Sequence, residues 1–219
     1  MTRDPAVTRA ERARAGARWC ATGVCGALVL AGIGLPALFG GQAGAATTSS
    51  LAPFLLKSHE EPGFTVSGHP TTITKPAGLI AGGSLTKSES KSFVSTLQKA
   101  GFVKAVEEGT TGSGSNEGLS LVIQFTNPAG AQAGAALFLQ VAKSGQVGTK
   151  LFSVPGVPGA QGVTVTGGAG GSANAYWSAG DCAFGSGAYE GLVTSPKAAA
   201  SPVQAGIRAQ AKRVGTTCP

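Results

Sequence analysis

The sequence predicts an α+β fold: an antiparallel sheet packed by two to three helices, preceded by an N-terminal signal or anchor helix. Three observations favour it. Strand-like segments come in groups rather than in regular alternation with helices, which is typical of antiparallel sheets. Three later segments carry helix start signals. The first 45 residues are basic and then apolar, and they differ in composition from the rest of the 219-residue chain.

The N-terminal segment has the pattern of an export signal. Five arginines and no lysine occur up to Arg18, and an apolar run rich in Ala and Gly occupies residues 20–40. Small side chains at Ala43 and Ala45 suit a signal peptidase, so we predict cleavage after Ala45. A retained membrane anchor is the alternative, because about 20 apolar residues can cross a bilayer. The expected domains are a signal or anchor at 1–45, a tether at 46–50 and a single extracytoplasmic domain at 51–219.

The first elements of this domain are a short helical turn in residues 51–56, a turn at 61–63 and a strand from Phe64. The clearest helix covers residues 87–100. Thr86 and Glu89 have capping-box spacing, and Gly101 can end the helix in a left-handed conformation. Its apolar face is Phe93, Val94, Leu97 and Ala100, which predicts packing on a sheet.

Two strands and a second helix follow. Residues 102–106 read as a strand, and residues 119–125 alternate between apolar and polar side chains, as a half-buried strand does. Residues 107–118 contain no apolar side chain, so we expect them to form a loop between an antiparallel pair. Asn127 followed by Pro128 is typical of a helix start, and this helix should continue to about Lys143.

The last third of the domain is rich in glycine. Two Val-Pro-Gly triplets in residues 154–159 predict turns, 163–166 a short strand, and 167–171 a flexible segment. Strands are expected at 175–178, 183–184 and 189–194, separated by turns at 180–181 and 185–187. A third helix is predicted to start at Ser201 and Pro202 and to stop at Gly215.

The charge of the exported part does not indicate nucleic-acid binding. The whole chain has a net charge of +7, but five positive charges lie in the first 45 residues. Residues 46–219 contain twelve basic and eight acidic residues, and the lysines are dispersed with little aromatic interleaving. A solvated surface explains them, and we predict no nucleic-acid partner. A membrane contact is expected only through an uncleaved N-terminal segment.

The exported part has two cysteines, Cys182 and Cys218. In an oxidising compartment such a pair is most simply a disulfide, worth about 3 to 4 kcal/mol in the chain-entropy model. The bridge would fasten the C-terminus. A metal site is the weaker alternative, because it needs two more ligands, and His59 and His69 have no suitable spacing to the cysteines. We therefore predict no metal and no cofactor.

The sequence lacks the usual catalytic patterns. His59 and His69 fall near the start in loop-like sequence, and there is no nucleophile-elbow motif. The glycine-rich residues 112–118 precede a strand rather than a helix and have no following lysine, so they do not form a phosphate loop. Paired carboxylates are also not evident. We predict that the protein is not an enzyme.

Two groups of residues are candidates for binding. Tyr176, Trp177 and Asp181 could form a ligand surface, with the aromatic rings stacking on a sugar, although core packing is the more frequent role of adjacent aromatics and Gly180-Asp181 is first a turn signal. Arg208, Lys212 and Arg213 could contact an anion. Positive charges near a helix C-terminus also favour the helix dipole, which is the simpler explanation.

Several segments resemble the small extracellular domains of actinobacterial envelope proteins, including the sensor-type domains of some receptor kinases. The resemblance covers most of residues 51–214 and rests on turns and apolar positions. They are Leu55-Leu56, Glu61 to Phe64, Phe125 to Ala131, Val154 to Ala160 and Ile207-Arg208. It implies a ligand-binding domain that often carries disulfides. No kinase portion is present in this chain.

The leading hypothesis is a non-enzymatic exported cell-envelope domain that binds a ligand or protein partner. It is expected to be secreted or to lie on the outer face of the cell membrane. A hydrolase acting on envelope material is the second hypothesis, and a deep pocket bringing His59 or His69 to a serine or to Asp181 would favour it. A purely structural secreted protein is the third.

Overall fold

The computed structural model describes residues 51–80, 85–114, 116–144, 148–167, 170–191, 196–216 and 218. The predicted signal or anchor, its cleavage site at Ala43 and Ala45, and the tether at 46–50 lie outside the described residues. Within the described ranges no helix has both the length and the apolar character needed to cross a membrane.

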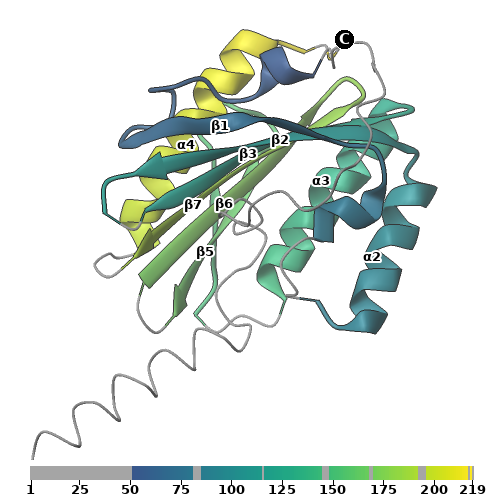
Figure 1. Ribbon diagram of the computed structural model, residues 1–219, viewed down its shortest axis with the longest axis horizontal. Helices are drawn as coiled ribbons and strands as arrows, with labels where there is room; N and C mark the ends of the chain where they lie inside the picture. The colour runs from purple at the N-terminus through teal and green to yellow at the C-terminus, as the bar shows by residue number, and fades with distance from the viewer. Residues whose placement is uncertain are drawn as a thin grey trace, which may run out of the picture.

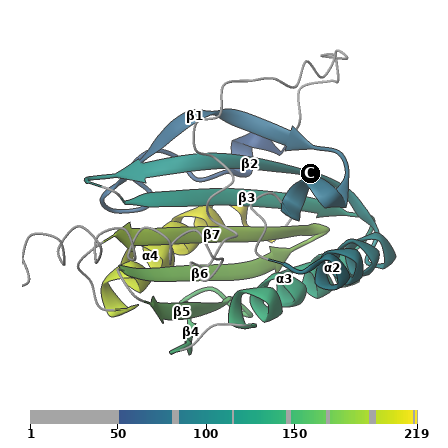
Figure 2. The same cartoon turned by 60° about the horizontal axis from the view of Figure 1, so that its bottom comes forward.

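The described strands form one antiparallel sheet in the order β1-β2-β3-β7-β6-β5-β4. Figure 2 shows this order across the sheet, with α2 and α3 on one face and α4 on the other. The strands are β1 (Phe64–Ile73), β2 (Phe102–Gly112), β3 (Glu117–Phe125), β4 (Lys150–Ser153), β5 (Gln161–Gly167), β6 (Gly170–Ala179) and β7 (Cys182–Gly191). The helices are η1 (Ala52–Phe54), η2 (Pro76–Ile80), α2 (Lys87–Lys99), α3 (Pro128–Lys143) and α4 (Pro196–Val214). The predicted α+β class, with an antiparallel sheet and three α-helices over the described ranges, is confirmed.

Local signals set the first two α-helices as expected. The Thr86 side chain accepts a hydrogen bond from the Glu89 amide, and the Glu89 carboxylate accepts one from the Thr86 amide, so the capping box forms. The Asn127 side chain caps α3 by accepting from the Gly130 amide, with Pro128 as the first helical residue. Both helices therefore begin where their sequences predict.

The sheet separates two apolar cores, and Figure 1 shows the helices that cover them. On the α2/α3 face, Phe138 packs edge-on against Phe93 and beside Tyr176. On the α4 face, Trp177 stacks on Phe184 beneath Val203 and Ile207. Because side chains alternate along β6, the adjacent Tyr176 and Trp177 enter different cores.

The predicted loop at 107–118 is wrong. Its residues extend β2 to Gly112 and start β3 at Glu117, and β2 lies between β1 and β3 with ladder pairing on both sides. A central strand needs its backbone groups paired but does not need apolar side chains. The buried Thr110 shows this, because its hydroxyl faces Glu61 and donates to it at 3.5 Å.

The predicted turn at Gly185-Ser186-Gly187 and the predicted flexible segment at 167–171 are also corrected. Residues 182–191 form one strand, β7. A side chain at Gly185 would lie 3.1 Å from the Tyr176 ring, so this glycine makes room for an aromatic neighbour rather than for a turn. Of the predicted flexible segment, Gly167 ends β5 and Gly170 and Gly171 belong to β6, whereas residues 168–169 lie outside the described residues.

The last helix begins five residues earlier than predicted. It starts at Pro196, and Pro202 lies inside it. Proline at 202 removes one backbone hydrogen bond from the helix. Burial of Ala200 and Val203 on either side of it shows that the apolar face of the helix continues through this position. Gly215, with φ of 68°, follows the helix and ends it as expected.

Candidate functional site

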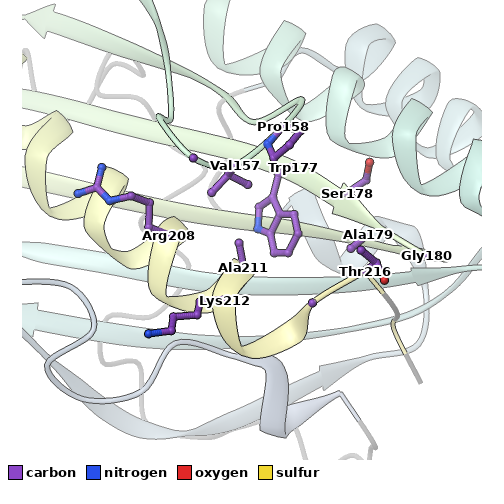
Figure 3. A pocket seen from close by; sticks show the side chains of 12 residues that line it. Val157, Pro158, Trp177, Ser178, Ala179, Gly180, Arg208, Ala211, Lys212 and Thr216 are labelled. Carbon is purple, nitrogen blue, oxygen red and sulfur yellow. The ribbon is translucent and has the colours of Figure 1, made fainter.

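A pocket lined by described residues lies on the α4 face. It has a volume of about 640 Å³ and is bounded by the end of β6, the 154–160 loop and the C-terminal part of α4. Figure 3 shows Trp177 at its centre. The lining residues are Gly156, Val157, Pro158, Trp177, Ser178, Ala179, Gly180, Arg208, Ala211, Lys212, Gly215 and Thr216. The volume is within the range of about 300 to 1,000 Å³ typical of small-molecule sites.

The loop wall is built by two successive β-turns. The Val157 amide donates to the Val154 carbonyl, and the Ala160 amide donates to the Val157 carbonyl. Each turn has proline second and a glycine of positive φ third, the pattern of a type II turn. Val154, Val157 and Ala160 are buried in the core below. The repeated Val-Pro-Gly sequence therefore anchors the loop through its apolar residues and leaves Pro158 beside the pocket.

Trp177 is held in position from two sides. Its ring stacks on Phe184 with centroids 4.4 Å apart, and its indole N–H donates to the Gln210 side-chain oxygen at 3.2 Å. The Gln210 side-chain nitrogen in turn donates to the Phe54 carbonyl at 2.8 Å. Trp177 is 4% exposed, and it is one of the residues that line the pocket. The indole is thus a fixed floor of the pocket.

The disulfide predicted between Cys182 and Cys218 is present. Each half-cystine follows a residue that lines the pocket: Cys182 comes two residues after Gly180, and Cys218 comes two residues after Thr216. The bridge therefore ties the β6–β7 turn to the segment that follows α4. The Asp181 carboxylate lies near both sulfurs, but sulfurs bonded to each other cannot act as thiolate ligands, so this group does not fit a metal site.

The candidate residues separate into those at the pocket and those elsewhere. Trp177, Arg208 and Lys212 line it. Tyr176 is buried on the opposite face, where burial raises the pKa of its hydroxyl, so the expected stacking surface shared by Tyr176 and Trp177 does not form. Asp181 lies in the turn beside the pocket and is not a lining residue.

Arg213, which was expected to contact an anion together with Arg208 and Lys212, is instead bonded within the protein. Its guanidinium pairs with both Glu60 carboxylate oxygens and donates to the carbonyls of Pro53 and Leu55. Burial by itself would raise the pKa of Glu60, but the hydrogen bond and charge of Arg213 hold that pKa below its ordinary value. Arg213 therefore fastens α4 to the segment around η1.

Sequence reasoning missed two buried polar residues on this face. Glu61 is 2% exposed and accepts hydrogen bonds from Ser186 and Thr110, and burial raises its pKa to about 7. Nothing in its Glu-Pro-Gly turn indicates this. Gln210 is fully buried, and it shares the spacing of Val203, Ile207 and Val214 on α4. That periodicity places Gln210 on the apolar face and could have identified it.

Comparison with known proteins gives one structural likeness. No protein-family model matches the chain, and a search of curated proteins finds no match. Among solved structures, the extracellular domain of PknH from Mycobacterium tuberculosis is similar, with a TM-score of 0.48 and 16% sequence identity over 76% of this chain and 97% of that one. That protein is an actinobacterial extracellular domain, the class that the sequence was expected to resemble. The likeness concerns the fold and identifies no ligand.

Proposed function

We propose that this protein is a non-enzymatic, sensor-like domain that works outside the cytoplasm and binds an envelope ligand in the pocket between α4 and the 154–160 loop. Two features support the location: the basic and apolar N-terminal sequence, and a disulfide, which persists in oxidising compartments. Cleavage after Ala45 is part of this proposal.

The observation that carries the binding function is the pocket with Trp177 as its floor. The indole has both its position and its N–H fixed by Phe184 and Gln210. A large aromatic that is already held in place loses little conformational freedom when a ligand packs against it. The disulfide and the double turn hold the walls in the same way. A ligand would thus meet a site formed in advance.

The two other hypotheses receive less support from the geometry. His59 lies in an exposed turn and His69 on the exposed edge strand β1, and neither lines the pocket. A hydrolase would need one of them beside a nucleophile. A purely structural role leaves unexplained a pocket of this volume over a supported tryptophan. Ligand binding accounts for both features.

Filling the pocket tests this proposal. Ala211 lines the pocket on α4, and Ala211→Leu should reduce its volume. Ala136 is exposed on α3 across the sheet, and Ala136→Leu makes the same chemical change there. Thermal shift should show that cell-wall fragments or lipid extracts raise the Tm of the unmodified chain and of Ala136→Leu, but much less that of Ala211→Leu.

Two results would contradict the proposal. One is that no envelope fraction raises the Tm of the unmodified chain. The other is that Ala211→Leu and Ala136→Leu respond equally, which would place binding away from this pocket. Far-UV circular dichroism of each variant checks that the fold is kept.

A further inference from the structure

We propose that the ligand of this pocket is an anionic amphiphile with a single apolar chain, whose chain lies over Trp177 and whose charged group meets Arg208 and Lys212. This inference rests on the proposed binding function and names its ligand class. It follows from three properties of the lining: apolar walls, unpaired cations at one side, and few groups that could hydrogen bond to a polar ligand body.

The walls suit an apolar chain. Val157 and Pro158 face the pocket from the loop, Ala211 from α4 and Ala179 from β6. A methylene transferred from water to such surroundings gains about 0.8 kcal/mol, which corresponds to about a fourfold change in Kd. Affinity should therefore rise with chain length until the pocket is filled.

The charge of the pocket is one-sided. Arg208 and Lys212 are one helical turn apart on α4, and both are exposed. In the described part of the chain neither has an ion-pair partner, whereas the neighbouring Arg213 is paired with Glu60. Among the described lining residues none is acidic. Figure 3 shows the charged ends of Arg208 and Lys212 on the α4 side of the pocket, pointing away from the indole, so an anion would sit at the outer edge of the pocket rather than on its floor.

The same lining is unsuited to a sugar. One face of the indole is covered by Phe184, and its N–H is already used by Gln210. The hydroxyls in the lining belong to Ser178 and Thr216 alone among its described residues. A sugar carries many hydroxyl groups, and each one buried without a partner lowers affinity. An apolar chain requires no such partners.

The test uses tryptophan fluorescence of the full chain. The protein has two tryptophans, so Trp19→Phe leaves Trp177 as the single reporter. Decanoate and decanol have equal chain lengths and differ in charge at pH 8. Below the micelle-forming concentration, decanoate should change the Trp177 signal and bind about tenfold more tightly than decanol, because charged hydrogen bonds add to the shared apolar contact. Octanoate should bind more weakly than decanoate.

Paired charge reversals locate the anion. Arg208→Glu with Lys212→Glu should weaken decanoate binding about tenfold or more and leave decanol binding unchanged. Lys91→Glu with Lys99→Glu changes the net charge equally on the exposed face of α2 and should leave both affinities unchanged. Equal losses in the two double variants would show that general charge, and not this pocket, attracts the anion.

The outcomes separate failure of the ligand class from failure of the binding function. Equal binding of decanol and decanoate overturns the anionic part. If neither probe binds but an envelope extract raises the Tm in an Ala211-dependent way, the pocket functions and the amphiphile class is wrong. Binding only to vesicles of anionic phospholipid, with no response to monomeric decanoate, would indicate a membrane-surface contact and overturn this inference. If no probe or extract acts, both proposals fail.

Discussion

The two faces of the sheet are built differently. On the α2/α3 face, Phe93, Phe138 and Tyr176 fill the space between helices and sheet, and the pocket beside them has a volume of only about 20 Å³. The α4 face contains a pocket of about 640 Å³, and the same face buries the polar side chains of Glu61 and Gln210. The difference indicates a division of roles: one face supplies dense packing, and the other provides a site held open by hydrogen bonds, turns and a disulfide.

The largest predicted effect concerns the densely packed face. Phe138→Ala removes the aromatic side chain that contacts Phe93 and Tyr176, and such truncations lower the free energy of unfolding by about 3 to 5 kcal/mol. Urea unfolding measures this change. At temperatures where the variant stays folded, its ligand affinity at the α4 pocket should equal that of the unmodified chain. A lower ligand affinity of Phe138→Ala would show that the two faces do not have separate roles.

The disulfide on the α4 face should affect both the stability of the protein and its affinity for the ligand. Its half-cystines are separated by 36 residues, so replacing both with serine should lower the free energy of unfolding by about 3 to 4 kcal/mol. Because the bridge holds Gly180 and Thr216 at the pocket wall, ligand affinity should fall as well, even where the protein remains folded. The Phe138→Ala variant, with a similar loss of stability, is the matched control. Equal affinities in the two variants would show that the bridge does not shape the site.

Glu61 gives the third prediction, a pH dependence of stability that comes from a buried acid on the α4 face. Burial raises its pKa from 4.5 to about 7, so the folded state binds this proton more tightly than the unfolded chain. Its contribution to stability is complete below pH 4.5, declines as pH rises toward 7, and is lost above it, a change of about 3 kcal/mol. Glu61→Gln should remove this decline and be the more stable protein at pH 8.

Urea unfolding between pH 4 and pH 8 measures the free energy of unfolding of the unmodified chain and of Glu61→Gln. Groups such as Glu60 contribute equally to both proteins, so their contributions cancel in the difference between the two free energies. The lowered pKa of Glu60 acts in the opposite direction, since its contribution is lost as pH falls. A difference between the two proteins that does not change with pH would show that Glu61 has the same pKa in the folded and unfolded states, so that burial does not raise it.

The sequence predicted those parts of the fold that depend on local signals. The Thr86 capping box, the Asn127 cap and the two Val-Pro-Gly turns depend on neighbouring residues only, and the structure contains each of them. Residues 107–118 and 185–187 were misjudged because their strand conformation depends on partners distant in sequence. β2 pairs on both sides, and Gly185 accommodates the Tyr176 ring. No local pattern carries that information.

The sequence also predicted only part of the candidate site, because the rest depends on contacts between residues that are distant in sequence. The disulfide followed from cysteine number, and Trp177, Arg208 and Lys212 stood out by residue type. That these three meet at one pocket, while Tyr176 and Arg213 do not join them, depends on strand alternation and on the ion pair with Glu60. Glu61 lay in an ordinary turn sequence, and only the packing of α4 over it makes it a buried acid.

The most direct test of the central claim is a two-dimensional ¹H–¹⁵N NMR titration of the Trp19→Phe chain with decanoate. The indole N–H of Trp177, which donates to Gln210, would give the single tryptophan side-chain signal. We predict that this signal shifts, together with the amides of Ser178, Gly180, Lys212 and Thr216. Shifts confined to α2, α3 and the strands beneath them would contradict the assignment of the ligand site to the α4 face.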